Sequence, residues 1–171
     1  MSSTLNTETR PQAPQHELMS QFSCQGDNLL LGRFSLSAIS TMLGKTVFYA
    51  YDRQVINQQI QRFRAAIPNR IKLHYAVKAN PYWPVVQHMR PLVDGFDVAS
   101  QKEMLLAIQS GMPVADISFA GPGKTDTELA AAITAGVTLN VESASELQRI
   151  CRLADTMRRG TERSNTAKAN T

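Results

Sequence analysis

The chain has few cysteines and no long hydrophobic segment. Its 171 residues include only Cys24 and Cys151, which are too far apart for a C-x-x-C or zinc-type pattern, so neither a disulfide framework nor a metal site is predicted. No apolar run approaches the roughly 18 residues that a membrane-spanning helix needs. The polar N-terminus also lacks the hydrophobic core of a signal peptide. We therefore expect a cytoplasmic protein with no membrane span.

Positive charge is in small and scattered excess. The formal net charge is +4 at pH 7, and much of the excess lies near the C-terminus. A basic stripe with interleaved aromatic residues, which nucleic-acid binding favours, is absent from the sequence. We interpret the charge as solvation of the surface and expect no nucleic-acid partner.

The most informative stretch is residues 74–81, where a single lysine ends a predicted buried strand. Alternation along a strand places His74 and Lys78 on one face. Pro81 ends the strand because proline has no backbone donor and restricts the residue before it. In an α/β barrel, active sites are built at this end of the strands, so Lys78 is a candidate to form a Schiff base. From position alone, an ordinary solvated surface lysine is the better-supported interpretation, because lysine is rarely buried unless paired.

Lys78 begins a repeat in the sequence. Ala99, Ala120 and Glu142 occupy similar strand-end positions, at steps of 21, 21 and 22 residues. The helix after each opens with a predicted capping box, in which a hydroxyl and a carboxylate satisfy backbone donors reciprocally. The three boxes pair Ser100 with Glu103, Thr125 with Glu128, and Ser143 with Glu146. Strands alternating with such helices predict an α/β fold with a parallel sheet.

Shorter elements are predicted before the lysine strand. Residues 1–27 are polar and are expected to be a flexible tail. The predicted elements that follow are a strand over residues 29–32, a helix over 34–43 closed by Gly44, a strand over 47–51, and a helix capped by Asp52. That last helix carries an apolar stripe, which we expect to face the core and which consists of Ile56, Ile60, Phe63 and Ile67.

Four motifs in order resemble the fold-type III pyridoxal-phosphate decarboxylases, the family of ornithine, diaminopimelate and arginine decarboxylases. They are YAVKAN at residues 75–80, GFDVAS at 95–100, ISFAGPGKT at 117–125, and VES at 141–143. The resemblance runs from about residue 29 to about residue 153. Within the family, the chain looks most like the exosortase A system-associated branch.

The resemblance implies a fold and a division of the chain. It implies a partial (β/α)8 TIM-type barrel of the alanine racemase-like class, without the later strands and the C-terminal β domain, because a complete barrel takes about 250 residues. Residues 28–52 would be an entry segment related to the second β domain, and 53–155 the N-terminal part of the barrel. Residues 156–171 are expected to be a disordered polar tail. This polar tail stands where the resemblance implies a fifth strand, and our hypothesis is that the encoding sequence is truncated or has a shifted reading frame.

The resemblance also implies roles for three residues. Lys78 would bond to pyridoxal 5'-phosphate, and Asp97 would lie near it and tune its proton, although a helix-entry aspartate or a structural aspartate is an alternative. His74 could point into the barrel and bind the cofactor, or be an interior histidine whose hydrogen bonds are satisfied. Residues 121–125 (GPGKT) imitate a phosphate loop, but Ser118 stands where that motif needs glycine, so nucleotide hydrolysis is not predicted. Lys124 is instead expected at the barrel mouth.

The function implied is that of a pyridoxal-phosphate-dependent amino-acid decarboxylase acting on a basic or diamino acid. The full-length family would form homodimers, and this chain alone is expected to be an inactive half barrel. Two alternatives remain open: a non-catalytic pyridoxal-phosphate-binding protein, and a cofactor-free fragment that associates with itself.

Overall fold

The computed structural model describes residues 21–169, with side chains up to residue 160. Residues 1–20, which make up most of the predicted flexible tail, lie outside the described residues. The chain divides into two compact units, Met1–Gln58 and Gln59–Thr171. Each unit is described by itself.

The first unit contains a small antiparallel sheet and a helix. Its strands follow the order β1 (Cys24–Gln25), β2 (Asn28–Leu31) and β3 (Phe34–Ser35). Helix α1 (Leu36–Leu43) is capped by the Ser35 hydroxyl and ends at Gly44, whose φ of 62° suits glycine. The predicted strand and helix are confirmed. Strand β1 lies within the segment that was expected to be a flexible tail.

The predicted strand over residues 47–51 is wrong. Val47 and Tyr49 are 88% and 93% exposed, and none of the described strands pairs with this segment. A β-strand is stabilised by its ladder and by packing against neighbours, so an alternating pattern without a partner strand does not suffice. The segment runs instead as irregular chain towards Asp52.

Helix α2 (Arg53–Ala66) begins at the predicted cap and spans the boundary between the units. Oδ1 of Asp52 accepts a hydrogen bond from the Gln54 N–H at 2.8 Å, which confirms the cap. No residue of α2 is buried, so the expectation that its apolar stripe faces a core is wrong in this structure. Ile60 and Phe63 line an open groove instead of a packed layer.

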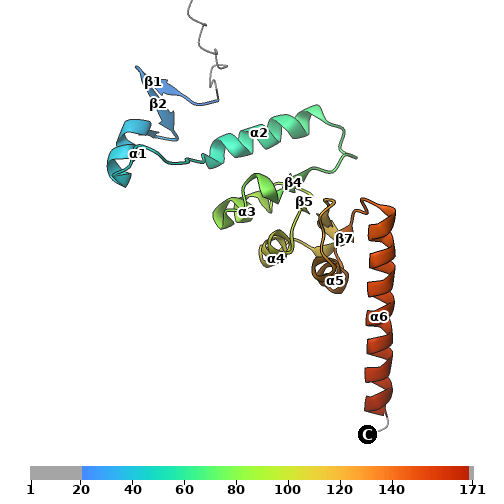
Figure 1. Ribbon diagram of the computed structural model, residues 1–171. Coiled ribbons are helices and arrows are strands. Elements are labelled where there is room, and N and C mark those ends of the chain that lie inside the picture. Colours follow the sequence, from blue (N-terminus) through green and yellow to red (C-terminus); the bar gives the residue numbers. More distant parts are fainter. Residues whose placement is uncertain (1–20, 170–171) are drawn as a thin grey trace, which may run out of the picture. The chain divides into compact units, whose positions relative to one another are not determined.

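The second unit contains a parallel sheet in which each strand is followed along the chain by a helix (Figure 1). The strands follow the order β4 (His74–Ala76), β5 (Gly95–Val98), β6 (Ile117–Phe119) and β7 (Thr138–Leu139). The helices are α3 (Trp83–Met89), α4 (Gln101–Gln109), α5 (Asp126–Ala135) and α6 (Ala144–Ala169), and two short 3-10 turns are η1 (Val77–Ala79) and η2 (Val114–Asp116). Four consecutive βα units confirm the predicted α/β fold, which is consistent with part of a TIM barrel.

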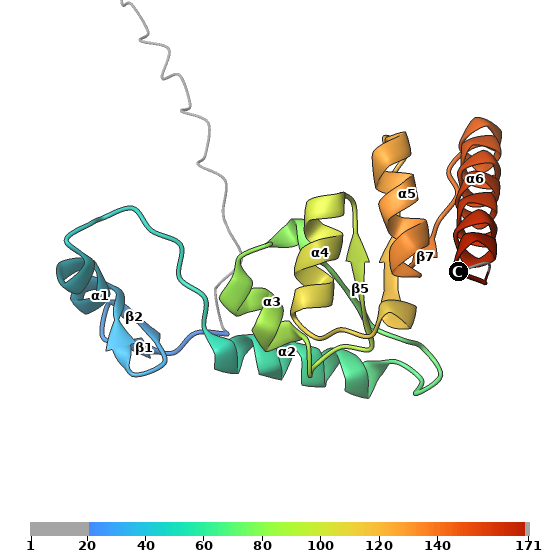
Figure 2. The same ribbon diagram turned by 90° about the horizontal axis from the view of Figure 1, so that it is seen from below.

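The two faces of this sheet differ in chemistry. One face is buried, and its four large apolar side chains are at most 2% exposed: Phe96, Val98, Ile117 and Phe119. Helices α3, α4 and α5 lie side by side along the sheet (Figure 2) and supply buried apolar side chains of their own, among them Val86, Met104, Ala107, Leu129 and Ala132. Burying each large side chain contributes roughly 1.5–3 kcal/mol. The other face carries the polar residues that alternate with this core.

Contacts at a 21-residue spacing join neighbouring βα units. The Leu73 N–H donates to Asp94, and the Arg90 guanidinium donates to the Gly111 carbonyl. The Ser118 hydroxyl donates to Asp97, and the Gly121 N–H donates to Glu142. The sequence repeat therefore reappears as a repeated tie between each unit and the next.

Helix α6 is longer than the sequence analysis predicted. It continues to Ala169, past residue 156, where a disordered polar tail was expected. Residues 157–169 mix good helix formers, such as three arginines and two alanines, with weak ones such as Gly160, so propensity alone does not predict a helix there. Lengthening an existing helix requires no new nucleus, which favours its continuation. Among the described helices, none is long and apolar enough to cross a membrane.

Candidate functional site

Lys78 lies just beyond the carboxyl end of β4. The strand ends at Ala76, two residues earlier than the alternation suggested, and Lys78 is the middle residue of turn η1. Val77 beside it is fully buried and anchors the turn to the core. Lys78 itself is exposed, and it makes no hydrogen bond or ion pair within the part of the chain that the structure describes. Its amine is therefore available for chemistry.

The loop after Lys78 is fixed by its own hydrogen bonds. The Asn80 N–H donates to the Val77 carbonyl at 3.1 Å and closes the turn. The Tyr75 hydroxyl donates to the Asn80 carbonyl at 3.0 Å, while the Asn80 side chain accepts from the Tyr82 N–H at 3.0 Å. The backbone that carries Lys78 is thus held at both ends of the turn.

The polar face of the sheet brings His74, Asp97 and Ser118 together. Strand register sets Asp97 opposite Ala76 on one side and Ser118 on the other. The Ser118 hydroxyl donates a hydrogen bond to Oδ1 of Asp97, and Nδ1 of His74 lies 3.9 Å from the same oxygen. The side chains of His74 and Asp97 are 28% and 49% exposed, so a ligand on this face could reach both.

Asp97 does not take part in capping the helix that follows it. The N-terminus of α4 is satisfied by the Ser100 hydroxyl, which accepts from the Glu103 N–H, and by the Glu103 carboxylate, which accepts from the Ala99 N–H. A helix-entry role therefore finds no contact in its favour among the described residues, whereas the hydrogen bond from Ser118 is one that a structural aspartate would make. The carboxylate faces the histidine and the serine instead.

Lys124 is buried, and the expectation that it lines the mouth of a barrel is wrong. Its Nζ donates to the carbonyls of Gly121 and Asn140 at 2.6 and 2.9 Å and to Glu146 at 2.8 Å. The side chains of Lys124 and Glu146 are 1% and 2% exposed. All three ammonium donors are used, so Lys124 is a structural residue that ties the loop after β6 to α6.

Two further residues make contacts that their sequence positions did not predict. Glu142, which had no assigned role, accepts from the Gly121 N–H at 2.8 Å and so ties two neighbouring loops together. Ser118 was considered only as the residue that breaks the phosphate-loop pattern. The signal that could have found it is the 21-residue spacing from Asp97, which sets both residues at the same height on adjacent strands.

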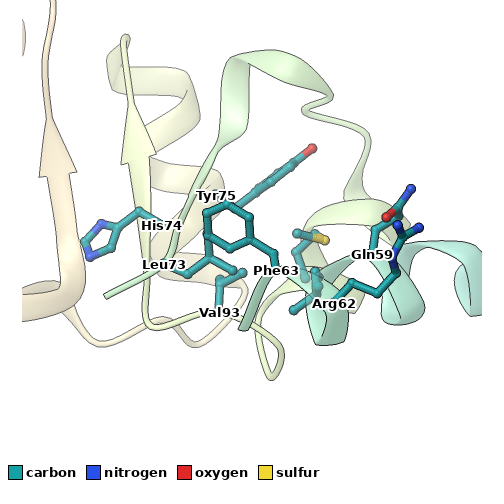
Figure 3. A pocket seen from close by; sticks show the side chains of 9 residues that line it. Gln59, Arg62, Phe63, Leu73, His74, Tyr75 and Val93 are labelled. Atoms are coloured by element: carbon teal, nitrogen blue, oxygen red, sulfur yellow. The ribbon is translucent and has the colours of Figure 1, made fainter. Parts of the chain in front are cut away.

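A groove of about 530 Å³ lies away from Lys78, near the amino-terminal end of β4 (Figure 3). Leu73 and Val93, which precede two neighbouring strands, line it together with Phe63. In Figure 3, Tyr75 and His74 point to opposite sides of the strand, as alternation requires. The groove is lined mainly by apolar side chains and does not contain the free amine.

The residues at the carboxyl end of the sheet fit an aldehyde cofactor such as pyridoxal phosphate. A bond to a carbonyl carbon requires an accessible neutral amine, and the Lys78 side chain is exposed and has no competing ion pair among the described residues. Asp97 lies on the polar face of the neighbouring strand, and His74, at the start of β4, lies on the same face towards the other end of that strand and also lines the groove. A carboxylate and an imidazole can hold a proton. No cluster of three or more potential metal ligands occurs in the described part of the chain.

Comparison with known proteins identifies the family. Residues 53–166 match the pyridoxal-binding domain of pyridoxal-dependent decarboxylases. Diaminopimelate decarboxylase of Pseudomonas aeruginosa is 34% identical over 138 residues, which cover 80% of this chain and 33% of the relative. A decarboxylase of Staphylococcus aureus, which acts on 2-[(L-alanin-3-ylcarbamoyl)methyl]-2-hydroxybutanedioate, is 38% identical over 103 residues, covering 60% of this chain and 26% of the relative.

Solved structures give the same result. A crystal structure of a protein from Aquifex aeolicus superimposes with a TM-score of 0.73 at 31% identity, covering 81% of this chain and 35% of the other. Diaminopimelate decarboxylase of Helicobacter pylori, complexed with L-lysine, gives a TM-score of 0.63 at 32% identity, with coverage of 70% and 31%. The chain spans only about a third of the length of these relatives. It belongs to the pyridoxal-dependent decarboxylase family, whose cofactor is pyridoxal phosphate, and matches the pyridoxal-binding domain over residues 53–166.

Proposed function

We propose that this chain binds pyridoxal phosphate covalently through Lys78 and contributes that site to the decarboxylation of a small amino acid. The observation that carries the proposal is the position of Lys78 just beyond the carboxyl end of β4, where it is exposed and unpaired among the described residues and lies within the stretch that matches the family's pyridoxal-binding domain. When bound, the cofactor supplies an aldehyde for the amine and a ring that takes up electrons when a carboxylate leaves. The assignment to the exosortase-associated branch remains a prediction.

Three side chains divide the work in this proposal. The Nζ atom of Lys78, as the neutral amine, would provide the electron pair for the bond to the aldehyde carbon, whose oxygen leaves as water, and the lysine would accept and return protons once substrate has displaced it. The Asp97 carboxylate stabilises positive charge that develops beside it, and His74, whose Nδ1 lies 3.9 Å away, stabilises that carboxylate when protonated. The turn hydrogen bonds around Asn80 hold the backbone that carries Lys78 in position.

The substrate class follows from the relatives. Several are named diaminopimelate decarboxylases, and one solved relative is complexed with L-lysine. We therefore propose a diamino acid as substrate, and a homodimer as the assembly in which it is turned over. Because the relatives are about three times as long as this chain, we expect cofactor binding, rather than turnover, to be the measurable property of the 171-residue protein.

Borohydride trapping tests the proposal. The full chain is incubated with pyridoxal phosphate and reduced, and the modified peptides are mapped by mass spectrometry. We expect near-stoichiometric labelling at Lys78 that disappears in Lys78→Ala. The matched control is Lys102→Ala, which removes another exposed lysine on the helix after β5 and should leave labelling at Lys78 unchanged.

The other outcomes favour the alternatives. Labelling scattered over many lysines and unchanged in Lys78→Ala would refute the covalent site. Specific labelling combined with an absence of carbon dioxide release, even after addition of the remaining two-thirds of a relative, would favour a non-catalytic pyridoxal-phosphate-binding protein. Concentration-dependent association without any pyridoxal affinity would favour the self-associating fragment.

A further inference from the structure

We propose that Ser118 is a positioning residue of the pyridoxal site, because its hydroxyl holds one carboxylate oxygen of Asp97 and leaves the other oxygen free to face a bound ligand. This inference rests on the proposed function, in which Asp97 lies beside the cofactor. It extends that function to a third strand of the sheet, since Ser118 lies on β6.

The two oxygens of Asp97 have different surroundings. Oδ1 accepts the hydrogen bond from Ser118 and is also the oxygen nearest to His74. Oδ2 has no hydrogen-bond partner among the described residues, and the side chain is half-exposed, so this oxygen is open to solvent or to a ligand. One oxygen is therefore held by the protein, and the other remains available to the polar face of the sheet.

A fixed partner matters because an aspartate side chain rotates easily. The terminal torsion of aspartate is broad and roughly two-fold, so a half-exposed carboxylate without a partner would sample many orientations. The Ser118 hydroxyl selects one of them. A functional group contributes most when its orientation is set before the ligand arrives.

The strand that carries Ser118 is rigid enough for this role. Its neighbours Ile117 and Phe119 are 1% and 0% exposed and point into the core, which leaves the serine on the opposite face at a fixed height. Strand register sets Ser118 directly opposite Asp97. The hydroxyl proton points at a carboxylate and not at the imidazole, so the trio is not arranged to make Ser118 a nucleophile.

The test compares Ser118→Val with Ser118→Thr, which have nearly the same shape and differ in the hydroxyl. We measure the concentration of pyridoxal phosphate that gives half-maximal trapping at Lys78, and the thermal midpoint of each variant. Since a hydrogen bond to a charged group is at stake, we expect Ser118→Val to raise that concentration about tenfold. Ser118→Thr should restore it to within about twofold of the wild type. If Ser118→Val does not fold, Ser118→Ala replaces it in the comparison with threonine.

A double-mutant cycle shows whether the serine acts through the aspartate. In an Asp97→Ala background, Ser118→Val should cause no further loss, because the group that it positions is gone. Equal binding by the valine and threonine variants, or the same additional loss with and without Asp97, would overturn the inference while leaving Lys78 as the covalent site. A wild-type chain with no preference for Lys78 would instead refute the proposed function, and the inference with it.

Discussion

The imidazole of His74 lies directly against the backbone of Gly95 on the neighbouring strand. A Cβ atom added to Gly95 would come within 2.5 Å of Cε1 and 2.8 Å of Nε2 of the ring, and it would also collide with the Asp116 carbonyl. The glycine therefore opens the space that the histidine occupies on the polar face of the sheet. Gly95 must therefore lack a side chain if His74 is to keep its position.

Gly95→Ala tests this relationship. Because both a ring and a backbone carbonyl must shift, we expect a loss of about 1–3 kcal/mol in the free energy of unfolding, measured by urea denaturation. Gly123→Ala is the matched control, since an added Cβ there meets nothing within 4 Å, and it should change stability by less than about 0.5 kcal/mol. Adding His74→Ala to Gly95→Ala should recover part of the loss and not all of it, because the carbonyl remains.

Acid should weaken the tie between α2 and the start of the sheet. The Arg64 guanidinium, 2.5 Å away, and the Leu73 N–H hold the pKa of the Asp94 carboxyl below its ordinary value of 3.8. A carboxyl with a lowered pKa in the folded state contributes its full stability above the unfolded value. That contribution is lost as the pH falls from about 4 through the folded pKa.

Asp94→Asn should therefore be less stable than the wild type at pH 7, and the difference should shrink below about pH 4. We expect a difference of about 1 kcal/mol at pH 7, at the low end for a charged hydrogen bond because each side chain is a third exposed. Thermal melts across this range measure it. Asp155→Asn, which removes an exposed ion pair with Arg158, is the control. A difference that grows on acidification would contradict the assignment.

Breaking the buried pair of Lys124 and Glu146 should be costly. Lys124→Met leaves a carboxylate without its partner in the interior, and we expect a loss of about 3–5 kcal/mol in urea denaturation. Lys124→Met combined with Glu146→Leu should recover most of this loss, because no buried charge remains. Arg158→Ala, at an exposed pair, should change stability by less than about 1 kcal/mol. Equal losses in the single and double variants would show that the lysine acts through the two carbonyls alone.

Glu128 should stabilise two helices at once. Its carboxylate accepts from the Thr125 N–H in the capping box of α5 and from the Gln101 N–H at the start of α4, and these donors hold its pKa below 4.5. Glu128→Gln should speed amide hydrogen exchange at both positions by several-fold, since each bond is worth roughly 0.5–1.5 kcal/mol. Glu103→Gln is the control, because among the described residues its carboxylate accepts only from the Ala99 N–H near α4, so the variant should leave α5 unchanged.

Local signals predicted most of the second unit. The pairs Thr125 with Glu128 and Ser100 with Glu103 located helix starts because their contacts lie within one turn. Only the first pair forms the full predicted capping box, since the Glu103 carboxylate accepts from the Ala99 N–H and not from the Ser100 N–H. The 21-residue steps predicted a parallel sheet, and the four motifs predicted the family. The position of Lys78 was correct to within the two residues by which β4 ends early.

The errors came where distant residues decide the outcome. Glu146 was expected to complete its own capping box, but its carboxylate binds Lys124, 22 residues earlier in the chain, and only the Ser143 half of the box forms. The segment 47–51 has the alternation of a strand but lacks a partner among the described strands. Ser118 acquires its role from the residue beside it on another strand, which no local pattern reveals.

The contacts that recur every 21 residues have a consequence for how the second unit comes apart. Each tie joins one βα unit to the next one along the chain, so coupling within this unit resembles that of a linear array with nearest-neighbour links. In such an array, loss of one link weakens the adjacent pair and leaves the others intact. The strand-and-helix units should therefore open one after another from an end, with amide protection graded along the sheet, and not in a single step.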